Sequence, residues 1–343
     1  MARRQGMKLL VVGPSWVGDM VMAQALFIDI QKRHPDAVID VLAPGWSLPI
    51  IARMPQVRRG IAAPWGHGKL NLKGQWQLAR TLKQEGYDKA LVLPRSFKSA
   101  LIPFMAGIPE RVGFSGEGRS FMLSDARKRR PTRSGNVITD KTVWRYMAMG
   151  VSKADYQRYQ FEVPSPALTI NKDNLKAVMA KLALPLDKPA IALCPGAEYG
   201  PSKQWPLESH RALAARLVAK GYQVWVMGGP KDVDAGQVIS DGQAFVFNLC
   251  GKTRLEDTVD LFAHCQQVVS HDSGLMHVAA AAGAPVVAIY GSTSPDFTPP
   301  LTGKATIVRH PIECSPCFER TCRFGHYRCL TEIGVEQVLE TLA

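Results

Sequence analysis

Long apolar runs are missing from this sequence of 343 residues. No stretch reaches the roughly 18 apolar residues that a membrane-spanning helix needs. The apolar segment that follows Arg3, Arg4 and Lys8 ends at Gly13-Pro14 and is too short for a secretory signal. With 46% hydrophobic and 21% charged residues, the composition is that of a soluble globular protein. We therefore expect a cytoplasmic protein without a membrane span.

Acidic residues are scarce in the first half of the chain. Residues 1–163 contain 26 Lys and Arg against 12 Asp and Glu, whereas the remainder contains 16 against 17. The whole net charge of +13 therefore comes from the first half. Such a one-sided basic surface indicates an anionic partner, such as nucleic acid, an anionic membrane or a polyphosphorylated substrate. A surface charge that only maintains solubility is the alternative.

Cysteines are few outside one short segment. Of seven cysteines, four lie close together as Cys314, Cys317, Cys322 and Cys329, with His326 nearby. A cytoplasmic location argues against structural disulfides. Four soft ligands within short reach would suit a structural zinc, but their spacing is not a standard zinc pattern, so reduced thiols remain the favoured interpretation.

Short apolar runs alternate with amphipathic helical patterns along the chain, which predicts an α/β fold with parallel sheets. In the first half we expect strands at residues 8–13, 37–42 and 89–93, and helices at 20–33, 75–85 and from about 99. The basic stretch 113–140 is predicted to be an exposed loop, and 156–166 to be a linker.

The alternation repeats after the linker. We expect strands at residues 190–194, 223–227, 268–270 and 286–290, and helices at 172–182, 207–220, 275–282 and 334–342. The pattern predicts two Rossmann-like domains, at residues 1–163 and 164–332, and a closing helix at 333–343. Two such domains imply a central cleft faced by the carboxyl ends of the strands, where open α/β sheets bind ligands.

The first strand leads into Gly13-Pro14-Ser15-Trp16-Val17-Gly18-Asp19. The glycine spacing matches neither a dinucleotide-binding nor an ATP-binding loop. What remains is a carboxylate at the start of a helix, able to accept a proton from a hydroxyl. On this loop alone, the favoured interpretation of Asp19 is a residue that only caps or stabilises the helix start.

Two loops of the second half suit a phosphate. Lys203 follows a glycine-containing turn, and its ammonium group is a compact charge for phosphate oxygens, although most lysines are simply solvated. Asp272, Ser273 and Gly274 lead from a strand into an alanine-rich helix, whose free N–H groups favour an anion. Asp272 would repel a diphosphate, so a hydrogen bond to the backbone or to a sugar hydroxyl is expected for it. His277 could neutralise phosphate charge or be an ordinary buried histidine.

Together these motifs resemble the heptosyltransferases of lipopolysaccharide core assembly over nearly the whole chain. The similar segments are Ser15-Trp16-Val17-Gly18-Asp19, Pro195-Gly196-Ala197-Glu198, Lys203 with Trp205-Pro206, Asp272-Ser273-Gly274-Leu275-Met276-His277, and Ser294-Pro295-Asp296-Phe297-Thr298-Pro299-Pro300. The resemblance implies a GT-B glycosyltransferase that inverts the anomeric centre, needs no cofactor or metal, and uses ADP-heptose. The acceptor implied is phosphorylated heptosyl-Kdo2-lipid A at the inner face of the cytoplasmic membrane, where the protein would bind peripherally.

Residue roles follow from the same resemblance. Asp19 matches the catalytic base. The positions implied to bind the donor are Lys203, Lys231, Asp232, Leu249, Asp272, Ser273, Gly274 and His277. The acceptor candidates are Ser15, Trp16, Gly18, Arg95, Ser96 and Lys98, whereas residues 127–130 (Arg-Lys-Arg-Arg) could contact lipid headgroups.

Other functions stay open at this point. The chain could add a different core heptose, or could be a nucleotide-sugar epimerase of the same architecture. A nucleic-acid binder is suggested by charge alone, and no nucleic-acid motif accompanies the basic residues.

Overall fold

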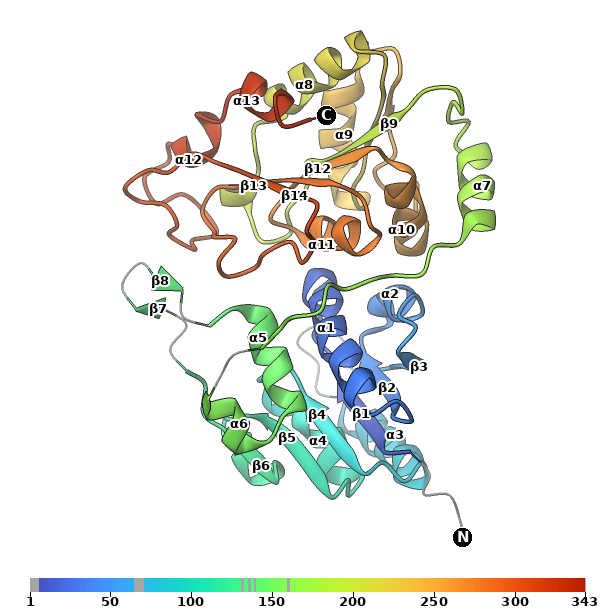
Figure 1. The fold of residues 1–343 in the computed structure, drawn as a ribbon, viewed down its shortest axis with the longest axis vertical. Helices are drawn as coiled ribbons and strands as arrows, with labels where there is room; N and C mark the ends of the chain where they lie inside the picture. Colours follow the sequence, from blue (N-terminus) through green and yellow to red (C-terminus); the bar gives the residue numbers. More distant parts are fainter. Residues whose placement is uncertain are drawn as a thin grey trace. The chain divides into compact units, whose positions relative to one another are not determined.

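The computed structural model describes residues 6–64, 71–130, 133–134, 137–138, 140–158 and 161–342. Residues 159 and 160 of the expected linker, and parts of the basic stretch 113–140, lie outside these ranges. The chain divides into two compact units, Met1–Pro166 and Ala167–Ala343. In Figure 1 the first runs from blue to green and the second from yellow-green to red.

The first unit is built around a six-stranded parallel sheet with the order β3-β2-β1-β4-β5-β6. Its strands are β1 (Lys8–Val12), β2 (Val38–Ala43), β3 (Val57–Ala62), β4 (Lys89–Val92), β5 (Glu110–Phe114) and β6 (Asp125–Arg127), and a separate antiparallel pair is formed by β7 (Arg133–Ser134) and β8 (Val137–Ile138). Its helices are α1 (Val17–Arg33), α2 (Leu48–Ile51), α3 (Leu72–Gln84), α4 (Phe97–Met105), α5 (Thr142–Met147) and α6 (Lys153–Arg158), with 3-10 turns η1 (Gly45–Ser47), η2 (Arg119–Met122) and η3 (Ala148–Gly150).

Successive side chains of β1 point to opposite faces of the sheet, so the core of this unit has two layers. Leu10 and Val12 face a cluster that includes Ala79 and Leu82 of α3 and Ala100 of α4. On the opposite side of the sheet α1 packs against α5. Helices therefore cover both faces, as a doubly wound parallel sheet requires.

The second unit repeats this plan, with the strand order β11-β10-β9-β12-β13-β14, again all parallel. The strands are β9 (Ala190–Cys194), β10 (Gln223–Val226), β11 (Val246–Asn248), β12 (Gln267–His271), β13 (Val286–Tyr290) and β14 (Ala305–Arg309). The helices are α7 (Lys172–Lys181), α8 (Leu207–Ala219), α9 (Val233–Ser240), α10 (Leu255–His264), α11 (Gly274–Ala281), α12 (Arg328–Thr331) and α13 (Val335–Leu339), with 3-10 turns η4 (Pro201–Lys203) and η5 (Pro230–Asp232). Every residue of β9, β12 and β13 is buried, and α13 packs against α8.

The prediction of an exposed loop over residues 113–140 is wrong in its first part. β6 lies inside that range and completes the sheet by pairing with β5. Its sequence, Asp-Ala-Arg, gives no apolar signal because β6 is an edge strand. The Arg127 side chain is nonetheless buried, because it pairs with Asp125 and donates to the backbone carbonyls of Ala148 and Val151.

Candidate functional site

Each sheet has one point at which the chain reverses its direction of winding. It lies between β1 and β4 in the first unit and between β9 and β12 in the second. Loops that leave the carboxyl ends of such a strand pair diverge to opposite faces and open a crevice for ligands. Most of the predicted site residues lie at these two points, whereas Lys231, Asp232 and Leu249 follow the neighbouring strands β10 and β11.

Asp19 lies in the first turn of α1, directly beyond the carboxyl end of β1. Trp16 occupies the N-cap position without a side-chain cap, and the Met20 N–H donates to the Trp16 carbonyl over 2.9 Å. Gly13 lies close to α1 and β2, since a Cβ there would lie 2.5 Å from Cε of Met20 and 3.3 Å from Cγ1 of Val41. The partly buried carboxylate also suits the positive end of the helix dipole.

Tyr146 of α5 was not found by sequence reasoning, although its hydroxyl hydrogen-bonds Asp19. Burial, followed by the charge of Asp19, raises the pKa of Tyr146 well above its ordinary value. The phenol therefore stays protonated and donates to the carboxylate. No local signal links the two positions, because only the packing of α5 on α1 brings them together.

The loop after β4 carries Arg95, Ser96 and, in the first turn of α4, Lys98. Because β4 pairs directly with β1, this loop and the one with Ser15, Trp16 and Gly18 leave the same edge of the sheet. The two predicted acceptor segments are thus neighbours in the first unit.

Arg119, which sequence reasoning also missed, holds the loop after β4 in place. Its buried guanidinium donates to Oγ of Ser99 over 2.7 Å, to the Ser96 carbonyl over 3.1 Å and to the Phe114 carbonyl over 2.8 Å. Burial, followed by the charge of Arg95, lowers the pKa of Arg119 to about 10, so it remains a cation near pH 7.

The suggestion that residues 127–130 touch lipid headgroups is wrong for Arg127, whose buried guanidinium is used internally. Arg130 donates to the Tyr156 carbonyl over 2.8 Å, and burial lowers the pKa of the half-buried Arg129. Arg127 and Arg130 are thus used in contacts within the first unit, whereas Lys128 is exposed.

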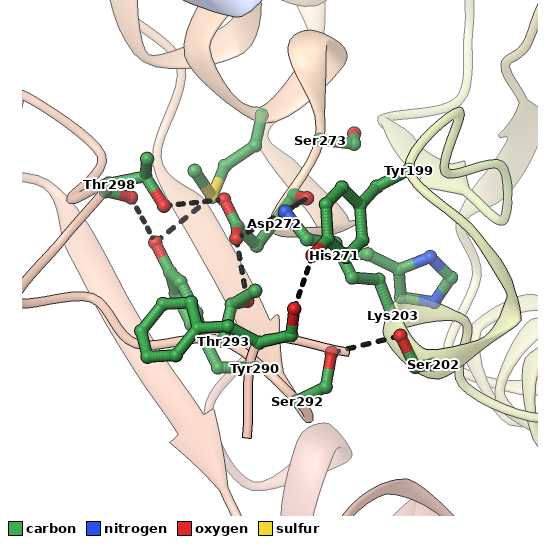
Figure 2. Close-up of polar contacts among 12 residues, drawn as sticks. Tyr199, Ser202, Lys203, His271, Asp272, Ser273, Tyr290, Ser292, Thr293 and Thr298 are labelled. Atoms are coloured by element: carbon green, nitrogen blue, oxygen red, sulfur yellow. Dashed lines mark hydrogen bonds and ion pairs between the residues drawn. The ribbon is translucent and has the colours of Figure 1, made fainter. Parts of the chain in front are cut away.

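Lys203 and Asp272 form the centre of the polar cluster in the second unit (Figure 2). Lys203 Nζ lies 2.7 Å from Oδ2 of Asp272 and 3.1 Å from its carbonyl oxygen. The Asp272 carboxylate also accepts from Thr293 Oγ1 at 2.6 Å and Thr298 Oγ1 at 3.0 Å. In the structure the Asp272 carboxylate contacts three side chains, those of Lys203, Thr293 and Thr298. The expected bond to the backbone or to a sugar hydroxyl stays a prediction. Asp272 positions the Lys203 ammonium group, which has three N–H donors.

The loop before Lys203 is held in place by backbone contacts. Gly200 adopts φ +148°, and a Cβ there would lie 2.5 Å from the Arg320 carbonyl oxygen. Tyr199 donates to the Phe318 carbonyl at 2.5 Å, while its ring lies 4.7 Å from Lys203 Nζ. The position of Lys203 is thus fixed from both sides.

Ser273 is the N-cap of α11 and Gly274 its first residue, so backbone N–H groups are presented at the carboxyl end of β12. His277 lies within the same helix and is buried. Burial lowers the pKa of His277 to about 4. Its imidazole is therefore neutral near pH 7 in the protein without a ligand and can donate a hydrogen bond. A role for His277 beside the phosphates stays a prediction.

Lys231 and Asp232 lie in η5, after β10, and Leu249 follows β11 as a buried side chain. Asp232 Oδ2 accepts from the Gly229 N–H over 2.8 Å, and Lys231 pairs with Glu198 over 2.9 Å. A Cβ on Gly196 would lie 2.4 Å from Oδ1 of Asp232, so the β9 and β10 loops are in direct contact.

The four clustered cysteines are free thiols, of which only Cys329 is buried. Cys322 Sγ lies 4.0 Å from Nδ1 of His326, and that nitrogen accepts from the Arg328 N–H over 3.1 Å. Within the ranges that the structure describes, no three His, Cys, Asp or Glu residues are arranged to hold a metal ion. The structural zinc that the cysteine spacing suggested is therefore not confirmed.

Comparison with a solved structure defines the class of the fold. The solved structure of Escherichia coli ADP-heptose LPS heptosyltransferase II superposes with a TM-score of 0.85 at 39% identity, covering 98% of this chain and 97% of that one. This similarity over nearly the whole chain shows that the two doubly wound units form the GT-B fold of a glycosyltransferase.

The family follows from sequence similarity. The model of glycosyltransferase family 9 (heptosyltransferase) matches residues 75–328. Lipopolysaccharide heptosyltransferase 2 of Salmonella typhimurium is 42% identical over 98% of this chain and 97% of its own length. Lipooligosaccharide heptosyltransferase 2 of Haemophilus influenzae is 40% identical over 98% of each. The chain belongs to glycosyltransferase family 9, the heptosyltransferases.

Proposed function

We propose that this heptosyltransferase moves L-glycero-D-manno-heptose from ADP-heptose onto the first heptose of the lipopolysaccharide inner core. The similarity over nearly full length to heptosyltransferase 2 proteins carries this proposal. The donor would be held by the loops around Lys203, Ser273 and Asp232, and the acceptor by the loops of Ser15 and Arg95.

The proposed reaction is one in-line displacement. Asp19 takes the proton from the acceptor hydroxyl while that oxygen attacks C1 of the donor heptose, and the C1–O bond to ADP breaks, inverting the anomeric centre. Lys203 and the N–H groups at Ser273 and Gly274 would stabilise the departing diphosphate. These groups supply the positive potential that a metal ion would otherwise supply, so we propose that transfer is independent of added metal.

The basic first unit supports an anionic acceptor. Its excess of Lys and Arg would attract a phosphorylated lipid saccharide by long-range electrostatics. The described residues contain no helix that is long and apolar enough to cross a membrane. We propose a cytoplasmic enzyme bound peripherally to the inner membrane, where such an acceptor would be met.

Substitution of the proposed base is the direct test. Asp19→Asn should lower turnover by roughly 100-fold or more while leaving the fold intact. Asp29→Asn is the matched control, because Asp29 lies on the same helix but pairs with Arg33 at the surface over 2.6 Å. Near-normal turnover of Asp19→Asn would reject Asp19 as the base.

The choice of acceptor is tested separately. ADP-heptose is incubated with Kdo2-lipid A carrying no heptose or one heptose, and with no acceptor. Transfer only to the singly heptosylated acceptor is expected. Transfer to the unheptosylated acceptor would indicate that a different core heptose is added, and conversion of ADP-heptose alone would indicate an epimerase.

A further inference from the structure

Exposed large apolar side chains gather on one side of the first unit. Phe121 of η2 is 66% exposed and Phe104 of α4 is 42% exposed. The Phe121 ring centroid lies 6.0 Å from that of Phe104 and 6.3 Å from that of Phe97. We call Phe97, Phe104 and Phe121 the aromatic patch. Phe97 is partly buried against the core and supports the two exposed rings. Neighbouring exposed apolar side chains of this size are a feature of interaction surfaces.

The neighbouring helix α3 continues the same character. It packs against α4, and both helices contribute to one core cluster under the sheet. Its solvent side carries Leu72 and Trp76, which are one turn apart and about half exposed. The Arg80 guanidinium lies 4.8 Å from the centre of the Trp76 ring. Large apolar residues interleaved with cations are typical of helices that lie in a membrane interface.

Charge on these elements has one sign. Helices α3 and α4 contain Lys73, Arg80, Lys83 and Lys98 and no acidic residue. The Arg111 guanidinium covers the Phe104 ring at 5.7 Å. The adjacent carboxylate, Glu117, accepts from the Phe97 N–H over 2.8 Å at the start of α4. The surface is therefore complementary to anionic lipid headgroups.

The patch is also continuous with the proposed acceptor loop. Phe97 begins α4 directly after Arg95 and Ser96, which leave the same sheet edge as the Asp19 loop. A saccharide whose lipid end is embedded beside Phe97 would have its polar end at Arg95.

We propose that the surface formed by the aromatic patch and the exposed side of α3 docks the enzyme on an anionic membrane. The rings enter the headgroup region, and the lysines and arginines pair with lipid phosphates. This proposal rests on the proposed function, because it names the surface through which the proposed peripheral membrane binding would occur. Vesicle binding can nevertheless be measured without heptose transfer.

Vesicle binding by the full chain tests the proposal without any substrate. The protein is cosedimented with vesicles of phosphatidylglycerol and phosphatidylcholine in equal parts, and with phosphatidylcholine alone, at low and high sodium chloride. We expect binding to the anionic vesicles, weakened by salt, and an affinity about tenfold lower for the double variant Phe104→Ser/Phe121→Ser.

A matched control is available in the second unit. Phe245 is 43% exposed, and Lys188 Nζ lies 4.6 Å from its ring centre. Phe245→Ser should bind vesicles as the unsubstituted protein does. Equal binding by the double variant and the unsubstituted protein, or equal binding to neutral and anionic vesicles, would overturn the proposal. So would a dimer in solution that the double substitution dissociates, because the patch would then be a contact between two copies.

Activity measurements distinguish a failure of the docking proposal from a failure of the proposed function. The double variant should keep its turnover on a soluble acceptor saccharide lacking the acyl chains and lose it on the same acceptor in vesicles. Loss on both acceptors would overturn a role confined to docking. Failure of the unsubstituted protein to transfer heptose would instead reject the proposed function and leave the vesicle result standing.

Discussion

Asp19 shows how little a single residue says outside its surroundings. An acidic residue in the first turn of a helix is a common stabilising feature. What distinguishes Asp19 is its place at the winding reversal between β1 and β4 and its hydrogen bond from a buried tyrosine. Tyr146 would act through Asp19 and not on the substrate, by positioning the Asp19 carboxylate and favouring its ionised form.

Removing that hydroxyl gives a prediction at the residue scale. Tyr146→Phe takes away a hydrogen bond to a charged group, which contributes about 1.5–3 kcal/mol. The ionised carboxylate becomes less favourable, so the acid limb of the turnover profile should move up by about 1–2 pH units. Turnover measured between pH 5 and 9 checks this shift.

Tyr156→Phe is the control for that experiment. Tyr156 is also largely buried in the first unit, but its hydroxyl donates to the Lys128 carbonyl over 3.1 Å. Loss of the Tyr156 hydroxyl should lower the free energy of unfolding modestly and leave the pH profile of turnover unchanged. The same displacement in both variants would assign the effect to packing instead of to the bond with Asp19.

Outer strands are one part of what the sequence pattern missed, beside the inner strand β5 and the helices α9 and α10. The central strands β1, β4, β9 and β13 were predicted, because their buried residues form continuous apolar runs. β3 and β14 were not predicted, because each is an outer strand with mostly exposed side chains. A strand that borders water needs no apolar signal, and pairing with its neighbour is enough to form it.

Contact between the β9 and β10 loops gives a prediction at the scale of elements. In Gly196→Ala the new methyl group would overlap Asp232, whose carboxylate is tethered to the Gly229 N–H and also adjoins Gly228. Asp232 must shift, and we expect a KM for ADP-heptose raised about tenfold, with a stability loss of about 1–3 kcal/mol. Initial rates and urea unfolding provide the two measurements.

Gly303→Ala is the matched control, since a Cβ there meets no atom within 4 Å. It should leave KM and the unfolding midpoint unchanged. An unaltered KM in Gly196→Ala would mean that Asp232 does not contribute to donor binding.

Three buried histidines give the whole protein an acid-sensitive unit. Burial lowers the pKa of His271 and of His277 to about 4, and that of His210 well below 6.5. His210 and His271 also face each other, with their Nε2 atoms 3.1 Å apart. All three are neutral in the folded state near pH 7.

Linkage between protonation and folding then fixes the sign of the pH dependence. Between pH 6.5 and about 4 the unfolded chain binds protons that the folded state excludes. The free energy of unfolding should therefore be at its full value above pH 6.5 and fall as the pH is lowered. Each histidine adds a slope of up to about 1.4 kcal/mol per pH unit.

Urea unfolding followed by circular dichroism at several pH values measures this slope. His277→Gln removes one of the three buried imidazoles. The histidine contribution to the slope of the free energy of unfolding against pH should therefore fall by about one third. An unchanged slope would show that His277 is already protonated in the folded state. His264→Gln is the control, because His264 is exposed at the end of α10, where its ring stacks on that of Trp225.

The sequence by itself determined the class of the fold, the family and the loops in which polar site residues lie. Known proteins confirm the family and the GT-B architecture. Both could be predicted because strand periodicity and loop motifs are local properties of the sequence. The roles proposed for Asp19, Lys203 and the acceptor residues remain predictions.

Only the tertiary structure decided which groups meet. Lys203 and Asp272 are 69 positions apart and form an ion pair because β9 and β12 are neighbours in the sheet. Arg127, expected at the surface, is buried because the carbonyls of a distant turn accept its hydrogens. Three phenylalanines became one patch in the same way. Contacts of this kind depend on which elements pack together, and a linear pattern carries no record of that.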